Sequence, residues 1–279
     1  MVLWIVLLPV VALLLAGLYG YYIMRTTQAQ MFEEPVIDIV APELPATIDA
    51  GAVLVYSKTS GGFRHSWSID AANTMMEILA TKHAWKLYFT ENAAVFNDEQ
   101  LSRFAVVVWN NATGAALSAA QRESFQRWLE GGGGYVGLHA AGDGSHASWG
   151  WYTNEVIGAD YNMHTILPEH TPEATVHVEN SEHPATAHLP ASWTLEEEWY
   201  AWHSNPRDGG AAILVTVDES TYTPWRATMG DDHPLVWSRQ LGDGRVFYSA
   251  FGHWEEAYSD PLLVPMMEQA VIWAGRLGR

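Results

Sequence analysis

The alternation of short apolar runs with amphipathic helix patterns constrains the fold of this chain more than any other feature. Ala52–Tyr56 (AVLVY) and Phe104–Trp109 (FAVVVW) are apolar and rich in β-branched residues, as expected of strands buried on both faces of a parallel sheet. Ile69–His83 has helical spacing of apolar residues, and Ser118 with Gln121 forms a capping box that opens a second helix. The pattern predicts βαβ units and a doubly wound, mostly parallel α/β sheet.

The remaining elements follow from the same patterns. Ser68 is expected to cap the first helix, and a helix over Pro261–Ala274 is expected to end the chain. Further strands are expected at Trp85–Phe89, Tyr135–His139, Ala174–Val178, Ala212–Val217, Leu235–Trp237 and Arg245–Ala250. Few helices separate the last four of these strands, so the second half of the chain is expected to differ in character from the first.

The N-terminal stretch predicts a membrane anchor. Val2–Met24 carries no charge and is about long enough to cross a ~30 Å hydrocarbon core, with a tyrosine cluster at one end. It exceeds the roughly 7 to 15 apolar residues of a cleaved signal, although cleavage after Ala29 is an alternative. Arg25 follows the span and no base precedes it, which favours a cytoplasmic domain. The expected organisation is an anchor at 1–25, a stalk at 26–50 and an α/β domain at 51–279.

The charge and the composition exclude several classes of function. The formal net charge is −18, from 32 acidic and 14 basic residues, which predicts that the protein does not bind nucleic acid or an anionic lipid surface. Neutral ligands such as sugars suit a chain with 14 Trp and 12 Tyr. The absence of cysteine excludes disulfides, thiolate metal sites and thiol nucleophiles.

Polar residues follow four of the predicted strands. Ligands of open α/β sheets bind outside the carboxyl ends of the strands, so these positions are the first candidates for a site. They are Arg64 with His65, Asn110 with Asn111, His139 through Asp143, and His253.

The most informative of these positions is the segment Gly137–Asp143 (GLHAAGD). A strand that turns sharply into small residues resembles a nucleophile elbow, where Ser or Cys stands at the apex. His139 takes the apex here, and the chain contains no cysteine that could replace it. Amidotransferase and cysteine-protease chemistry are therefore excluded by residue type.

A series of short motifs, in order along the chain, resembles the ThuA-like (trehalose-utilisation-like) family between about Val53 and Trp273. The motifs are Ser57-Lys58-Thr59, Gly62-Phe63-Arg64-His65, Gly132–Ala141 (GGGYVGLHAA), His183-Pro184, Glu198-Trp199-Tyr200, His233–Trp237 (HPLVW), Gly244–Tyr248 (GRVFY) and Gly252-His253. The resemblance implies a class I glutamine amidotransferase-like, flavodoxin-related fold without the amidotransferase nucleophile. It also implies a link to the catabolism of disaccharides and their keto derivatives.

Two further expectations depend on this resemblance. Members with an N-terminal anchor look like envelope proteins, so the domain is expected on the periplasmic or extracytoplasmic side despite Arg25. The chain departs from the family pattern where His164 is followed by Thr165 instead of proline.

We predict catalytic roles for His139, Glu198, His253 and His233, with the first three also serving as ligands of Zn²⁺, Mn²⁺ or Fe²⁺. Glu196 and Glu197 are expected to be solvated surface charges. The residues expected to bind substrate are Arg64, His65, Asn110, Asp143, His164, Trp199, Tyr200 and Trp254.

These side chains are expected to meet in one cleft at the edge of the sheet. Such a cleft predicts an enzyme that acts on a glycoside or keto-sugar by hydrolysis, elimination or isomerisation, using His and Glu as acid and base. The alternatives are a non-catalytic carbohydrate-binding protein and a scaffold protein of the cell envelope. In the first two hypotheses the partner is a small carbohydrate.

Overall fold

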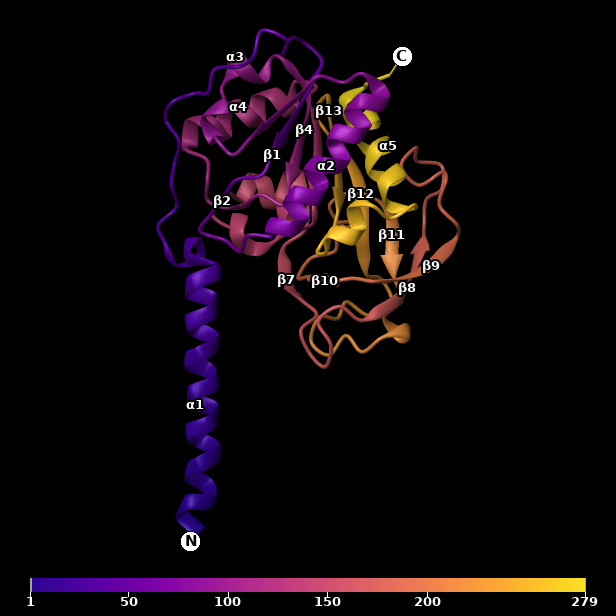
Figure 1. Cartoon of the computed structure of the whole chain (residues 1–279). Coiled ribbons are helices and arrows are strands. Elements are labelled where there is room, and N and C mark those ends of the chain that lie inside the picture. The colour runs from indigo at the N-terminus through magenta and orange to yellow at the C-terminus, as the bar shows by residue number, and fades with distance from the viewer. Residues whose placement is uncertain (1, 279) are drawn as a thin grey trace.

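A nine-stranded mixed sheet forms the centre of the computed structural model, which describes residues 2–278 (Figure 1). Met1 and Arg279, the outer ends of the expected anchor and domain, lie outside the described residues. In spatial order the strands are β3 (Leu87–Thr90), β1 (Ala52–Tyr56), β4 (Phe104–Asn110), β6 (Gly134–Leu138), β13 (Gly244–Ser249), β12 (Pro234–Leu241), β11 (Ala212–Val217), β8 (Glu173–Val178) and β9 (Ser192–Glu196).

The sheet has a parallel half and an antiparallel half. Neighbouring strands from β3 to β13 pair in parallel, whereas those from β13 to β9 pair antiparallel. Because each second antiparallel step restores the direction, seven of the nine strands point the same way. The predicted α/β class is confirmed, and the change of character in the second half corresponds to the antiparallel strands.

Helices cover both faces of the parallel half. The helices α2 (Ser66–His83) and α5 (Leu263–Gly275) pack on one face, where α2 contacts β3 and β4 and α5 contacts β4, β6 and β13 (Figure 1). On the opposite face α4 (Ala119–Glu130) places Phe125 against the rings of Trp109 and Tyr135. A short helix, α3 (Asp98–Leu101), packs beside α4. This arrangement is the doubly wound one that the sequence predicts.

The capping box of α4 is observed, but the predicted cap of α2 is wrong. The Ser118 hydroxyl and the Gln121 side chain bond each other's backbone N–H groups, as the sequence predicts. In α2 the helix begins at Ser66 with His65 at the N-cap position, and Ser68 lies inside the first turn. The Ser68 hydroxyl donates instead to the carbonyl of His253, so this residue joins α2 to a distant loop.

Two small ribbons lie at the carboxyl edge of the large sheet. β2 (Thr59–Ser60) pairs with β5 (Thr113–Gly114), and β7 (Tyr161–His164) pairs antiparallel with β10 (Tyr200–Trp202). None of these ribbon strands was predicted, because each is too short to show a period. They are important because they frame the site described below.

The N-terminal helix α1 (Val2–Thr27) extends away from the domain (Figure 1). Within it, Pro9–Thr27 is long and apolar enough to cross a membrane, and it is not buried against the domain. A signal sequence has the same properties. The helix is therefore an apolar span of sufficient length, and its orientation does not follow from it.

Residues 33–50, which belong to the predicted stalk, lie against the domain, and side chains of the domain bind their backbone. Asn92, Gln100 and Gln121 donate to three carbonyl groups of this segment. The Asp38 carboxylate pairs with Lys58 and also accepts from the backbone of Ala93. The proline-bearing sequence therefore runs along the domain surface as a fixed strap.

Candidate functional site

Four side chains from distant parts of the chain meet at the carboxyl edge of the parallel half. His139 follows β6, His253 follows β13, His65 precedes α2, and Glu198 lies just before β10. All four are buried, and one nitrogen or oxygen from each lies within 4.8 Å of the others. The expected meeting of His139, His253 and Glu198 is observed. His65, which was predicted to bind substrate, belongs to the same group.

The elbow after β6 orients the His139 ring. His139 has a φ of 46°, in the left-handed region that non-glycine residues rarely adopt. Its carbonyl accepts from the Tyr248 hydroxyl at 2.8 Å, which holds the turn in place. The Ala250 carbonyl lies 2.7 Å from His139 Nδ1, and because a carbonyl only accepts, Nδ1 carries a proton. His139 Nε2 is therefore the nitrogen that faces the cluster.

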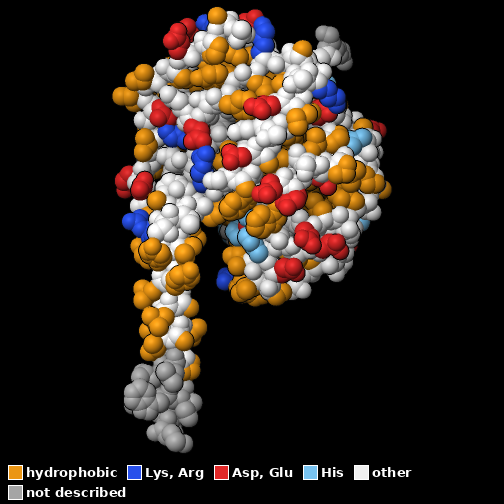
Figure 2. Space-filling view, viewed as in Figure 1, with side chains coloured by type: hydrophobic (Ala, Val, Ile, Leu, Met, Phe, Trp, Pro, Cys, Tyr) orange, Lys and Arg blue, Asp and Glu red, His pale blue; other side chains and the backbone are white. Residues whose placement is uncertain are grey.

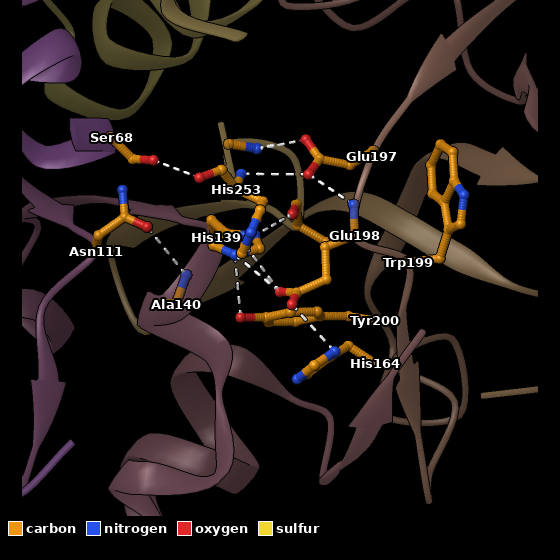
Figure 3. A network of polar contacts seen from close by, with 12 residues as sticks. Ser68, Asn111, His139, Ala140, His164, Glu197, Glu198, Trp199, Tyr200 and His253 are labelled. Carbon is orange, nitrogen blue, oxygen red and sulfur yellow. Dashed lines mark hydrogen bonds and ion pairs between the residues drawn. The ribbon is translucent and has the colours of Figure 1, made fainter. Parts of the chain in front are cut away.

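Glu198 stands at the centre, and its two oxygens face different histidines (Figure 3). Oε2 lies 3.2 Å from His139 Nε2 and 3.2 Å from His253 Nδ1. Oε1 lies 3.0 Å from His164 Nδ1 and 2.5 Å from His170 Nε2. One carboxylate thus joins a buried pair of histidines to a second pair at the surface.

The electrostatics of the cluster favour an ionised Glu198 and neutral rings at His65 and His253. Burial alone would raise the pKa of Glu198, but its contacts with His139, His170 and His253 hold that pKa well below the usual range. Burial and the neighbouring histidines lower the pKa of His65, and burial lowers that of His253 despite the nearby carboxylate. For His139 burial also opposes the charged form, yet the interaction with Glu198 outweighs it and raises the pKa.

Two nitrogens of the cluster have no hydrogen-bond partner. The Nδ1 atoms of His65 and His253 are both buried and unpaired, although the latter lies 3.2 Å from Glu198 Oε2. This contact is close enough for an ion pair but does not have the geometry of a hydrogen bond. Buried polar atoms in native proteins normally have partners. Neutral imidazole nitrogens and a carboxylate oxygen that converge in this way form a donor set suited to Zn²⁺, Mn²⁺ or Fe²⁺.

Glu197 holds the backbone of the site, and its predicted role as a solvated surface charge is wrong. The residue is 3% exposed, and its carboxylate accepts from the backbone N–H groups of Glu198, Gly252 and His253. Burial raises its pKa. Glu197 therefore ties the loop after β13 to the segment before β10. Glu196 is exposed, as predicted.

The outer pair reaches solvent. His164 ends β7 and its side chain is 29% exposed, whereas His170, in the loop between β7 and β8, is 43% exposed. Histidine side chains are visible at the notch between α1 and the neighbouring lobe (Figure 2). His164 was predicted to bind substrate, but His170 was not identified. His170 lies in an irregular loop, so a search restricted to strand ends could not find it.

Two residues predicted to bind substrate border the cluster. Tyr200 is buried in β10, and its hydroxyl lies 3.2 Å from His139 Nε2. Trp254 is half-exposed, packs edge-on against His253, and stacks on Trp67 at 5.9 Å. A cleft of about 700 Å³ adjoins Trp254, and its lining includes Thr171, Glu197 and four further carboxylates, Glu196, Glu255, Glu256 and Asp260.

His233, predicted to be catalytic, lies outside the cluster. Its Nδ1 is 2.7 Å from the Glu219 carboxylate and its Nε2 is 2.7 Å from the Tyr200 carbonyl. Both ring nitrogens of His233 are therefore engaged by partners outside the cluster. The structure does not bring His233 together with the other predicted catalytic residues.

Four predicted substrate-binding residues have structural partners instead. The Asn110 amide donates to the Ile69 carbonyl and to Asn73 in α2. Asp143 is half-buried and its carboxylate accepts from the Ser145 N–H at the start of a turn, and desolvation raises its pKa. Arg64 forms an ion pair with Glu91 at the surface, and Trp199 is buried with its indole N–H donating to the carbonyl of Pro172. The structure thus gives these four residues partners within the protein and does not bring them into the histidine cluster.

Solved structures share this fold. A protein of Bacteroides uniformis described as ThuA-like is 24% identical, with a TM-score of 0.70 over 84% of this chain and 95% of that one. A second protein so described, from Parabacteroides merdae, is 17% identical, with a TM-score of 0.60 over 81% and 90%. A β-galactosidase of Rahnella sp. R3 is 14% identical, with a TM-score of 0.54 over 83% of this chain but 32% of its own. These identities establish a common fold and no common activity.

The family follows from the sequence match. A search of the curated proteins found no match. The family model ThuA, described as trehalose utilisation, matches residues 52–274, which span the sheet, its helices and every residue of the histidine cluster. This chain therefore belongs to the ThuA family.

Proposed function

We propose that this protein is a metal-assisted enzyme that acts on a glycoside or on a keto-sugar derived from one. The observation that carries the proposal is the buried group of His65, His139, His253 and Glu198, in which two imidazole nitrogens lack partners. Buried unpaired nitrogens that face one carboxylate are costly unless a ligand uses them. Membership of a family named for trehalose utilisation supports the choice of substrate class.

The four buried residues would hold one divalent ion. The hydrogen bond from His139 Nδ1 to the Ala250 carbonyl fixes the ring and leaves Nε2 as the donor atom, an arrangement common among metal-binding histidines. Glu197 orients Glu198 and His253 through their backbone. When bound, such an ion supplies a Lewis acid that polarises a carbonyl oxygen.

Proton transfer takes place at the open edge of the cluster. A C–H bond next to a ketone is acidic enough for a basic group to remove its proton. The electron pair of that bond then forms a carbon–carbon double bond as the glycosidic bond breaks, and the departing oxygen takes up a proton. Glu198 Oε1 is buried, but His164 and His170 beside it reach solvent, where a substrate can approach.

The surroundings suit a polyhydroxylated, uncharged ligand. Trp254 and Trp67 form a stacked pair that exposes apolar ring surface beside His253. The carboxylates of the neighbouring cleft accept hydrogen bonds from hydroxyl groups and repel anions. The acidic character of the whole chain acts in the same direction.

We further propose that α1 is a retained membrane anchor. Its apolar span ends at Thr27, and the side chain of Gln28 accepts from the Arg64 N–H at 2.8 Å and donates to the Arg64 carbonyl at 3.2 Å. Arg64 directly precedes His65 of the cluster. An anchor joined to the domain in this way holds the site close to the membrane surface, on the extracytoplasmic side.

The test uses the full chain in detergent micelles. Bound metal is removed with a chelator, the protein is reloaded with Zn²⁺, Mn²⁺ or Fe²⁺, and turnover of a 3-keto-glycoside and of its parent glycoside is measured. We expect turnover with at least one metal. His139→Ala should lower it by on the order of 10³-fold, because the variant removes a donor from the reaction centre.

His177→Ala is the matched control, since His177 is half-exposed on β8 with Asp218 as its acidic neighbour. It should retain full turnover. A folded, metal-loaded chain that binds either sugar without converting it would overturn the enzymatic proposal in favour of a carbohydrate-binding protein. A chain that neither retains metal nor binds sugar would overturn the proposal entirely.

A further inference from the structure

Five histidines surround Glu198. A single ion bound by one carboxylate would not need so many histidine ligands. His65, His139 and His253 form one group with Glu198. His164 and His170 form a second group with the same glutamate, and the potential ligand atoms of this group also lie within 4.8 Å of one another. The first group is fully buried, whereas the second reaches solvent. The shared residue presents Oε2 to the inner group and Oε1 to the outer one.

We propose that the site holds two divalent ions bridged by the Glu198 carboxylate. This inference deepens the proposed function and rests on its inner metal position. The outer ion is bound by Glu198 Oε1, His170 and His164, and its remaining coordination positions are open to water or substrate. Carboxylate-bridged ions in two-metal sites lie about 3.5–4 Å apart, a separation that the two oxygens of one carboxylate can span.

The inner and outer positions are expected to differ in their affinity for metal, because their nitrogens have different contacts. Each inner nitrogen is either unpaired or faces Glu198 from a ring held by the backbone. In the outer position His164 Nδ1 also lies 2.8 Å from the Thr165 carbonyl. An ion can use this nitrogen only after the contact with the Thr165 carbonyl has been given up. The outer ion therefore binds more weakly.

A second ion also changes which group accepts the substrate proton. Once His164 and His170 donate their lone pairs to a metal, neither ring can serve as the base. A water molecule between two ions then becomes the basic group at the open edge. Such centres suit ligands that present two adjacent oxygens, and a keto-sugar carries a carbonyl beside a hydroxyl. The outer position thus specifies an α-hydroxyketone as the part of the substrate that is recognised.

Titration of the metal-free full chain with Mn²⁺ in detergent tests the proposal without any turnover assay. We expect two ions per chain in two steps, the second at least ~10-fold weaker than the first. The electron paramagnetic resonance spectrum should change from the six-line signal of an isolated ion to that of a spin-coupled pair as the second step fills. Saturation at one ion, with an uncoupled spectrum at millimolar Mn²⁺, would overturn the two-ion proposal.

Variants separate the two positions. His170→Ala, at a half-exposed loop residue, should abolish the second step and the coupled spectrum while the first ion still binds. His177→Ala is the control and should retain both steps. One ion together with turnover leaves the proposed function standing and overturns the bridged pair. A folded chain that binds no ion overturns both.

Discussion

Two glutamates meet histidines in this molecule, and their surroundings are opposite. Glu219 accepts from the Thr228 hydroxyl, from two backbone N–H groups and from His233, whose second nitrogen donates to the Tyr200 carbonyl. Glu198 faces histidine nitrogens instead, and two of the buried nitrogens around it have no hydrogen-bond partner. In the first cluster both ring nitrogens of His233 have partners, whereas the second cluster contains buried nitrogens without partners.

The difference shows that residue type does not identify a site. Both clusters combine a glutamate with histidine at the same edge of the fold. At Glu219 every donor has an acceptor, so a ligand has nothing to bind and the network contributes to stability. At Glu198 the unsatisfied nitrogens carry an energetic cost that a bound cation would remove. The free lone pairs, and not the count of histidines, mark the functional cluster.

The largest expected effect contrasts Glu198→Gln with Glu219→Gln. An amide at position 198 binds cations more weakly than a carboxylate, so metal affinity should fall by at least ~100-fold and turnover with it. Glu219→Gln should leave the metal content unchanged. Elemental analysis of both purified variants, with activity on the same samples, checks the contrast. Equal metal loss in the two variants would end the distinction between the clusters.

A smaller effect, of different size for the two clusters, is expected in the free energy of unfolding. His233→Ala leaves the Glu219 carboxylate and the Tyr200 carbonyl without their donor, which should cost about 3 kcal/mol and lower the Tm by roughly 6 to 12 °C. His139→Ala should cost less in the metal-free protein, because it removes one of several crowded rings.

Thermal unfolding of the metal-free full chain in detergent, followed by near-ultraviolet circular dichroism, measures both variants of this pair. Wild-type protein unfolded under the same conditions provides the reference. If His139→Ala proved the more destabilising of the two, the cluster around Glu198 would be a structural network like that around Glu219.

The parallel half of the fold and its part of the site could be predicted from the sequence. The apolar strands of this half run parallel, so their carboxyl ends lie at one edge of the sheet. The polar residues that follow these strands must therefore lie at that edge as well. His65, His139 and His253 were found in this way, and all three lie in the cluster. The elbow at His139 was also readable, because a strand that ends in small residues predicts a sharp turn.

The antiparallel half of the fold and its part of the site could not be predicted from the sequence to the same degree. β12, which follows His233, runs antiparallel to β13, so β12 begins at the edge where β13 ends. No pattern in the sequence indicates that the His233 ring turns towards Glu219. Glu197 and Glu198 are adjacent in a segment between strands, where no period indicates which side chain faces the cluster. Their separate roles depend on the loop at His253, which packs against them from 55 residues away.

The smallest expected effect concerns His183, which resembles the functional cluster in one respect. Its Nε2 is buried without a partner, as in the cluster, but it packs against Trp273 and belongs to neither group of potential metal ligands among the described residues. Burial, and to a lesser degree Arg245, lowers its pKa to about 4, from 6.5. Between these values the unfolded chain binds a proton that the folded chain does not, so stability falls as the pH drops from 6.5 towards 4.

His183→Phe keeps a ring against Trp273 and removes the titration, so its loss of stability over this pH range should be smaller than that of the wild type. The difference is expected to be modest, because the imidazole is half-buried and partly solvated. His177→Gln, at a half-exposed histidine, should follow the wild-type curve, and both variants should retain their metal. Loss of metal from His183→Phe would mean that an unpaired nitrogen alone marks a binding site. Retention would show that several such nitrogens must converge on one carboxylate.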